Sequence, residues 1–101
     1  MSAALPDHGK CIRLLIRMRG LKEKDVAAAI GMYPTHFSEM LHGRRRLTAK
    51  AAVPLAKVIK TEPARILYWQ AEWECRIVEN GGVVAYDGAE QRIKNKNFKK
   101  Q

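Results

Sequence analysis

Two short helical segments separated by one glycine constrain this chain more than any other part of its sequence. Residues 22–30 carry apolar side chains four apart on one helical face, with three consecutive alanines between them, and Gly31 follows directly. Pro34 suits the first position of the next helix, because proline needs no N–H there and its φ is already helical. Gly43 ends that helix after about two and a half turns. This pattern predicts two helices that meet at a sharp angle.

The N-terminal segment and residues 48–59 predict two more helices. Asp7 can cap the first, and Gly20 is placed to end it in the left-handed conformation. Its inward positions are expected at helical spacing, at Cys11, Leu14, Leu15 and Met18. Thr48 can cap the later helix, and Pro54 is expected to kink it or to shift its start. Its expected inward positions are Ala52, Leu55, Ala56 and Ile59.

Pro63 begins a fifth segment that has two interpretations. Helical spacing of large side chains continues to a stop signal at Asn80-Gly81-Gly82, through Ile66, Leu67, Trp69, Gln70, Trp73 and Ile77. Alternatively, residues 76–79 and 83–86 flank an Asn-Gly pair and form a hairpin. We favour a helix that ends near Asn80, followed by one short strand at 83–86. The two tryptophans are expected in the core or in a dimer interface.

The predicted fold is therefore all-α, with a five-helix domain in residues 1–80 and an extension in residues 81–101 made of a short strand and a basic tail. A chain of 101 residues has room for one core. The longest apolar run has eight residues and a bilayer span needs about 20, so no membrane helix is expected. No secretory signal is recognisable, which favours a cytoplasmic protein with two buried, reduced thiols at Cys11 and Cys75.

Positive charge is concentrated in one part of the chain. The formal net charge is +9, and residues 44–60 alone hold six basic residues and no acidic one. That stretch begins with Arg44, Arg45 and Arg46, directly after the helix that Gly43 ends. A basic cluster of this kind is typical of a surface that faces phosphates.

The second helix of the Gly31 pair is expected to present polar side chains to solvent. Spacing places five of them outward: Thr35, His36, Ser38, Glu39 and His42. A narrow helix with short polar groups fits the major groove of B-DNA, where each base pair shows a distinct set of donors and acceptors. Glu39 is able to accept a hydrogen bond from a cytosine amino group, and Thr35 is able to pack on a thymine methyl.

The same block resembles a known family. The pattern Ala27-x3-Gly31-x5-Phe37-x2-Met40-Leu41-x-Gly43-Arg44-Arg45 resembles the helix-turn-helix of the Cro/cI (XRE) regulators, which have the lambda-repressor-like fold. The resemblance spans residues 9–73. It implies a five-helix domain whose third helix reads bases, with base-contacting positions at Pro34, Thr35, Ser38 and Glu39. The implied phosphate-contacting positions are Glu23, Tyr33, His42, Arg44 and Arg45, among which Glu23 would face a phosphate unfavourably.

A second resemblance supplies an alternative function. Residues 47–70 are similar to HigA-type antitoxins, in which a last helix that begins with proline carries an aromatic residue and a glutamine. That subfamily binds an RNase toxin and represses its own promoter. On this interpretation the fifth helix would pair with a basic toxin through its acidic side chains, Glu72, Glu74 and Glu79.

The expected function is sequence-specific binding of double-stranded DNA by a homodimer that represses transcription, with the antitoxin as the alternative. No enzyme activity and no cofactor are expected, because no nucleophile stands beside a base and no glycine-rich phosphate loop occurs. His36 and His42 share a helix with Glu39, but the two imidazoles point about 120° apart, which disfavours a metal site.

Overall fold

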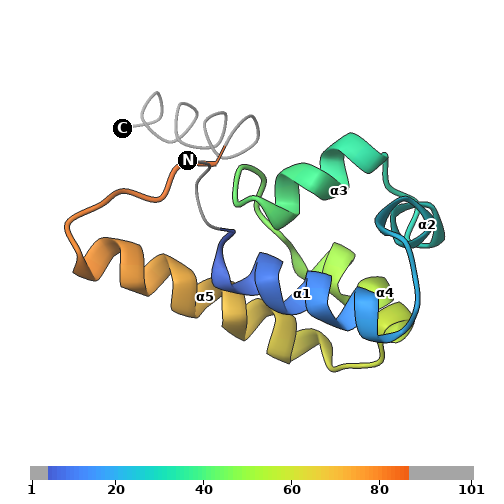
Figure 1. The fold of residues 1–101 in the computed structure, drawn as a ribbon. Helices are drawn as coiled ribbons and strands as arrows, with labels where there is room; N and C mark the ends of the chain where they lie inside the picture. The colour runs from blue at the N-terminus through green and yellow to red at the C-terminus, as the bar shows by residue number, and fades with distance from the viewer. Residues whose placement is uncertain (1–4, 87–101) are drawn as a thin grey trace.

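Glycine and proline separate the helices where the sequence predicts. The computed structural model describes residues 5–86, which form α1 (Asp7–Met18), α2 (Glu23–Ala29), α3 (Pro34–Leu41), α4 (Ala49–Ile59) and α5 (Pro63–Glu79). These helices enclose one apolar core (Figure 1). Residues 5–86 contain no strand, so the prediction of an all-α fold is confirmed for that part of the chain.

The turn between α2 and α3 has the predicted form. Gly31 adopts φ +73°, a conformation in which a side chain is strained, and Pro34 is the first residue of α3. Val26 and Ala27 of α2 are completely buried beside Phe37 of α3. The small side chain of Ala27 lets the two helices approach closely at this angle.

The buried face of α1 differs from the predicted one. Ile12 and Ile16 are 0% and 3% exposed, whereas Leu14 and Met18 are 53% and 63% exposed. Cys11 and Leu15, also expected inside, are only partly buried, and of the predicted four it is Leu15 that packs against the core. Both sets of side chains repeat at helical spacing, so periodicity alone does not distinguish them. The packing of α1 on α3 and α5 selects the face that carries the isoleucines.

The start of α1 explains this choice. A Cβ at Gly9 would lie 2.0 Å from the carbonyl oxygen of Leu41, so glycine is the residue that allows α1 to contact the end of α3. The predicted cap is wrong, because Pro6 is the N-cap and Asp7 is already helical. The carboxylate of Asp7 instead accepts a hydrogen bond from the guanidinium of Arg76 on α5.

Helix α4 supplies much of the core, as predicted. All four of its expected inward residues are at most 2% exposed: Ala52, Leu55, Ala56 and Ile59. Thr48 is the N-cap by position, although its side chain makes no capping hydrogen bond. Pro54 does not shift the start of the helix, which runs through it to Ile59. The apolar contacts on both sides of Pro54 offset the backbone hydrogen bond that proline removes.

Helix α5 ends at Glu79, with Asn80 as its C-cap, so the helical interpretation is confirmed and the hairpin is wrong. Its tryptophans face inward and pack beside the core rather than forming an outer surface. Cys75 is exposed, contrary to the expectation of two buried thiols.

The short strand predicted at 83–86 is also absent from the described residues. Tyr86 folds back onto α5, where its hydroxyl donates a hydrogen bond to Glu74 at 2.5 Å and its ring lies 6.3 Å from that of Trp73. An extended segment needs a neighbouring strand to satisfy its backbone groups, and here its neighbour is a helix. The predicted basic tail falls in residues 87–101, outside the described residues.

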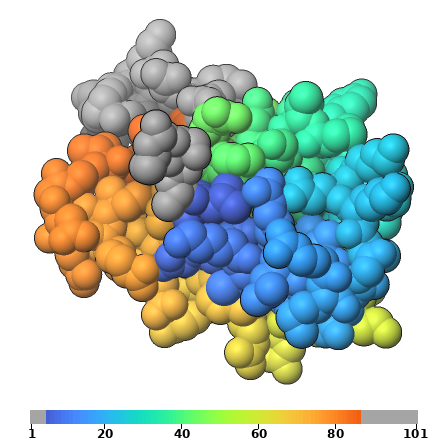
Figure 2. All heavy atoms as spheres, viewed as in Figure 1, coloured from blue at the N-terminus to red at the C-terminus, as the bar shows by residue number. Residues whose placement is uncertain are grey.

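The arrangement leaves α3 at one edge of the molecule. Figure 2 shows α1 at the centre of one face, α3 beside it and α5 along the opposite margin. Helix α3 packs against α1 and α2, while α5 packs against α1 and α4. None of the helices in residues 5–86 is long and apolar enough to cross a membrane.

Candidate nucleic-acid interface

Helix α3 has one buried side and one polar side. Phe37, Met40 and Leu41 are at most 1% exposed and fix the helix to the core. The opposite side, together with the turn before it, holds the residues that the sequence marks as DNA-binding. Tyr33, Pro34, Thr35 and His42 are exposed, and His36, Ser38 and Glu39 are partly exposed. We refer to these seven residues as the polar side of α3.

The beginning of the polar side is aromatic. Tyr33 is 72% exposed, and its ring stands perpendicular to that of His36 with the centroids 5.4 Å apart. This edge-to-face contact restrains two side chains that extend into solvent at the start of α3. Pro34 and Thr35 lie exposed beside them.

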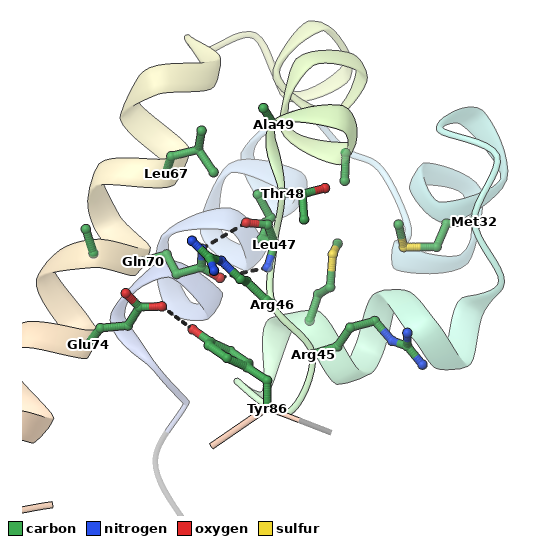
Figure 3. Close-up of a pocket in the computed structure, with 13 residues that line it drawn as sticks. Met32, Arg45, Arg46, Leu47, Thr48, Ala49, Leu67, Gln70, Glu74 and Tyr86 are labelled. Carbon is green, nitrogen blue, oxygen red and sulfur yellow. Dashed lines mark hydrogen bonds between the residues drawn. The ribbon is translucent and has the colours of Figure 1, made fainter. Parts of the chain in front are cut away.

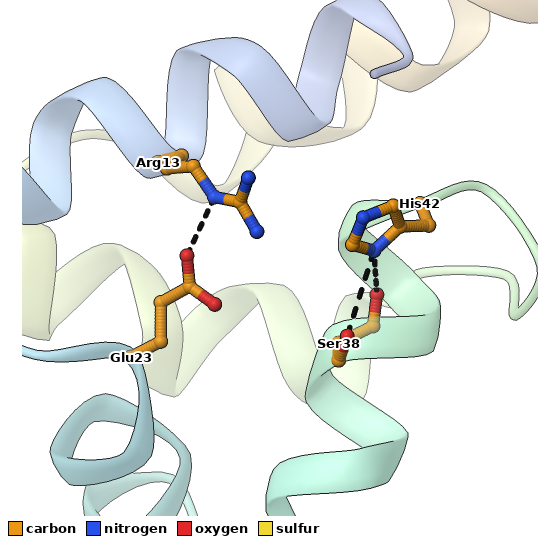
Figure 4. A network of polar contacts seen from close by, with 4 residues as sticks. All are labelled: Arg13, Glu23, Ser38 and His42. Carbon is orange, nitrogen blue, oxygen red and sulfur yellow. Dashed lines mark hydrogen bonds and ion pairs between the residues drawn. The ribbon is translucent and has the colours of Figure 1, made fainter. Parts of the chain in front are cut away.

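The end of the polar side is ordered by hydrogen bonds within α3. Nδ1 of His42 donates to the carbonyl oxygen of Ser38 at 2.8 Å, and the Ser38 hydroxyl lies 3.5 Å from the same nitrogen (Figure 4). His42 is the C-cap of α3, and its backbone N–H donates to the same Ser38 carbonyl oxygen at 3.0 Å. The imidazole is therefore held in place and still exposed.

Three consecutive arginines follow the end of α3, and we call residues 44–46 the arginine loop. Arg44 and Arg46 are exposed. Arg45 is bound to Glu39, with Nε 3.1 Å and Nη2 3.0 Å from the carboxylate oxygen Oε1. The carbonyl oxygen of Glu39 also accepts hydrogen bonds from the backbone N–H groups of Arg44 and Arg45. Glu39 therefore fixes the loop through both its backbone and its side chain.

This ion pair changes the interpretation of Glu39. The sequence predicts a carboxylate that is ready to accept a hydrogen bond from a base. In the folded chain that carboxylate already binds Arg45, so Glu39 orients the arginine and cancels one charge of the loop.

The other acidic residue near the candidate interface is neutralised in a similar way. Glu23, in the first turn of α2, accepts a hydrogen bond from Nε of Arg13 on α1 at 2.5 Å (Figure 4). The family resemblance places Glu23 opposite a phosphate, where an unpaired carboxylate would be repelled. Its pairing with Arg13 reduces that repulsion, and spacing along one helix does not reveal the pair because Arg13 belongs to a different helix.

The end of α3 packs on three residues whose position there the sequence did not predict: Pro6, His8 and Trp73. Gly43 has φ +77° and packs against Trp73 and Pro6. His8 is completely buried, and its Nε2 donates to the carbonyl oxygen of Met40 at 3.2 Å. Its ring lies 5.2 Å from that of Trp73. Burial lowers the pKa of His8 below the usual value, although its bond to Met40 acts in the opposite direction.

The other end of the arginine loop is fastened to α5. Gln70 is 4% exposed, and its amide both accepts from the N–H of Leu47 at 2.8 Å and donates to the Leu47 carbonyl at 2.9 Å (Figure 3). The loop is one wall of a groove of about 670 Å³ that Glu74 and Tyr86 close on the α5 side. In Figure 3 the side chain of Arg45 extends away from Gln70, toward α3.

The structure therefore brings the ten sequence-marked residues onto one continuous stretch, the polar side of α3 and the arginine loop. Three residues outside this stretch, His8, Arg13 and Gln70, help to hold it in place. The sequence does not reveal these roles, because each side chain contacts a different helix or loop from its own. No protein-family model and no curated protein matches this chain, so the assignment of a function depends on this geometry.

Proposed function

We propose that this protein binds duplex DNA in a sequence-specific manner and represses transcription as a homodimer. Repression would follow from occupying a promoter and blocking access of the polymerase. On this proposal the operator is a short inverted repeat whose half-sites lie roughly 34 Å apart, one turn of the double helix.

One observation carries the proposal: α3 is a short helix that is anchored on one side, open and polar on the other, and followed at once by three arginines. A helix of this width fits the major groove, and cations at its end are suited to the adjacent phosphates. Thr35 and Ser38 have the side chains suited to contact base edges. Arg44 and Arg46 are suited to phosphates, as is Arg45 while it remains oriented by Glu39.

The anchoring of α3 supports the same proposal energetically. A helix of eight residues is not stable alone, and here its position is set by Phe37, Met40 and Leu41 in the core. Gly43 and Gln70 then fix both ends of the segment that holds the arginines. Such preorganisation lowers the entropy lost on binding.

The salt dependence of DNA affinity tests the proposal. Each phosphate contact releases a counterion, so Arg44→Ala/Arg45→Ala should reduce the slope of log K against log salt by about 2 and weaken binding strongly. Fluorescence anisotropy with duplexes selected from a random pool measures both quantities.

The matched control removes two charges elsewhere. Lys57 lies in the last turn of α4 and Lys60 is its C-cap, at the far end of a helix about 16 Å long whose start follows the arginine loop. Lys57→Ala/Lys60→Ala has the same net charge as the arginine variant and should keep most of the wild-type slope. Equal slopes for the wild type and the arginine variant would contradict the proposed role of the loop.

A further inference from the structure

The groove beside the arginine loop, which we call the loop groove, is lined mainly by apolar side chains. They come from four parts of the fold: Met32 in the turn before α3, Met40 of α3, Ala51 of α4 and Leu67 of α5. Its volume of about 670 Å³ lies within the range of roughly 300–1,000 Å³ that is typical of small-molecule pockets. An organic molecule that covers these side chains would remove apolar surface from water.

One wall of the loop groove is positively charged. Arg45 and Arg46 line this wall, and in Figure 3 the side chain of Arg46 extends toward α5 while that of Arg45 turns toward α3. Arg45 is bound to Glu39. The side chain of Arg46 is exposed and makes no hydrogen bond or ion pair with any of residues 5–86. Arg46 is therefore the cation of this wall whose donors are available to an anion.

The start of α4 adds to the positive wall. Thr48 and Ala49 line the groove, and Thr48 is the N-cap of α4 although its hydroxyl makes no capping hydrogen bond. The first N–H groups of a helix have no partners within it and carry a partial positive charge. They reinforce the attraction that Arg46 exerts on an anion.

The α5 side of the groove carries the opposite charge. Glu74 is the acidic residue among the described residues that line the groove, and its carboxylate accepts a hydrogen bond from the Tyr86 hydroxyl at 2.5 Å. A ligand carboxylate would be repelled by Glu74 and attracted by Arg46. The charged end of a ligand is therefore expected at the arginine loop.

Met32 and Met40 indicate which apolar group fits the groove. A methionine side chain is flexible, and its polarisable sulfur contacts the edge of an aromatic ring favourably. Ala51 and Leu67 line the groove with them and add aliphatic surface. A flat ring that carries an anionic group at one end matches both the lining and the charged wall.

We propose that the loop groove binds a small aromatic carboxylate, whose charged group pairs with Arg46 and whose ring lies against Met32 and Met40. The consequence for DNA rests on the proposed function. An arginine that is paired with a ligand is lost to a phosphate, so the ligand would weaken DNA binding and relieve repression. The loop groove would then make the repressor responsive to a small molecule.

Titration of the full chain with cinnamate, without DNA and followed by NMR chemical shifts, tests the site. The amide signals of Thr48, Ala49 and Ala51 should shift and reach saturation. Cinnamamide has nearly the same shape without the charge and should bind about fivefold more weakly or worse, the loss of one charge-assisted hydrogen bond. Equal binding of cinnamamide, or no shift with cinnamate, would overturn the proposal. Equal affinity for inorganic phosphate would also overturn it, because the apolar lining would then contribute nothing.

Two pairs of variants test the charge and the apolar lining separately. Arg46→Gln should raise the dissociation constant of cinnamate about fivefold or more. Arg44 is an exposed arginine of the same loop that does not line the groove, so Arg44→Gln is the matched control and should stay within about twofold of the wild type. Ala51→Phe should fill the groove and abolish the shifts, whereas Val53→Phe adds the same ring at a residue of α4 that is 44% exposed and should not.

Arg46→Gln changes an exposed side chain, so it keeps the test decisive if Ala51→Phe fails to fold. Wild-type affinity of Arg46→Gln for cinnamate would contradict the proposed site. In the presence of duplex DNA, saturating cinnamate should weaken DNA binding about threefold or more, and unchanged DNA affinity would refute the proposed release. The titrations without DNA decide whether the groove binds the ligand, while the salt experiment decides the DNA-binding function independently.

Discussion

Gly43 connects the polar helix α3 to the arginine loop, and its φ of +77° is one that side chains tolerate poorly. A Cβ at this position would lie 2.8 Å from Cη2 of Trp73 and 2.9 Å from Cγ of Pro6. Gly31 provides a comparison, because its φ is +73° but, apart from its own chain neighbours, no atom of residues 5–86 lies within 4 Å of the place a Cβ would occupy. Substitution of the two glycines therefore distinguishes the cost of backbone strain, which both share, from the cost of a steric conflict, which only Gly43 has.

Gly43→Ala is expected to destabilise the protein by about 2–3 kcal/mol, from left-handed strain together with overpacking against Trp73. Gly31→Ala should cost only about 1 kcal/mol, from the strain alone. Urea unfolding followed by circular dichroism measures both values. Equal losses for the two variants would mean that Trp73 and Pro6 yield without cost, and that the junction of α3 and the arginine loop is not tightly packed.

At the scale of the element, α3 and the arginine loop act as one unit because Glu39 binds Arg45. The pair is partly exposed, so its contribution to stability is small. The pair has a larger effect on the binding of DNA, since the Glu39 carboxylate both restrains one arginine and repels phosphates. The sequence suggested a base contact for Glu39, and the folded chain suggests a positioning role.

Glu39→Gln keeps an oxygen that accepts from Arg45 and removes only the negative charge. It should strengthen binding to random-sequence duplex DNA by roughly threefold, the size of a partly exposed charge interaction, while the free energy of unfolding changes little. Fluorescence anisotropy at fixed salt measures the affinity. Glu62, an exposed residue just before α5, provides the control, because Glu62→Gln makes the same change of net charge away from the arginine loop. Equal gains from both variants would show that net charge, and not the pairing with Arg45, determines the effect.

At the scale of the whole molecule, His8 links stability to pH. The ring is buried where α1, α3 and α5 meet, and its Nδ1 has no hydrogen-bond partner among the described residues. Burial lowers the pKa of His8 below its usual 6.5, outweighing its bond to Met40 and the nearby carboxylates of Glu74 and Asp7. The unfolded chain therefore binds a proton at His8 that the folded chain does not. Stability is then greatest above pH 6.5 and falls as the pH drops below it.

Between about pH 7.5 and 5.5 the wild type should lose up to about 1.4 kcal/mol of unfolding free energy from this one residue. His8→Gln keeps a donor for the Met40 carbonyl but does not titrate, so its stability should change less over the same range. His36→Gln removes a partly exposed histidine and should keep the wild-type dependence. Chemical denaturation at both pH values makes the comparison, and a His8→Gln variant with the full loss would contradict the assignment.

The sequence predicted the positions of all five helices and the polar side of α3. These features depend on local rules, because Gly31 and Pro34 mark the ends of helices through their own backbone preferences. The inward residues of α4 were also correct, since Ala52, Leu55, Ala56 and Ile59 recur at helical spacing and all four are buried. The strand at 83–86 failed because a strand depends on a neighbour that the local sequence does not specify.

By itself, then, the sequence determined an all-α chain with a short polar helix followed by three arginines, because helix periodicity and end signals act over a few residues. The tertiary structure alone decided which face of α1 is buried, that Gln70 binds Leu47, and that Glu39 and Glu23 are paired. Each of these contacts joins groups whose positions depend on how the helices and the loop pack together. Their geometry is set by close packing and by the need to pair buried polar groups, and no pattern within a single helix contains that information.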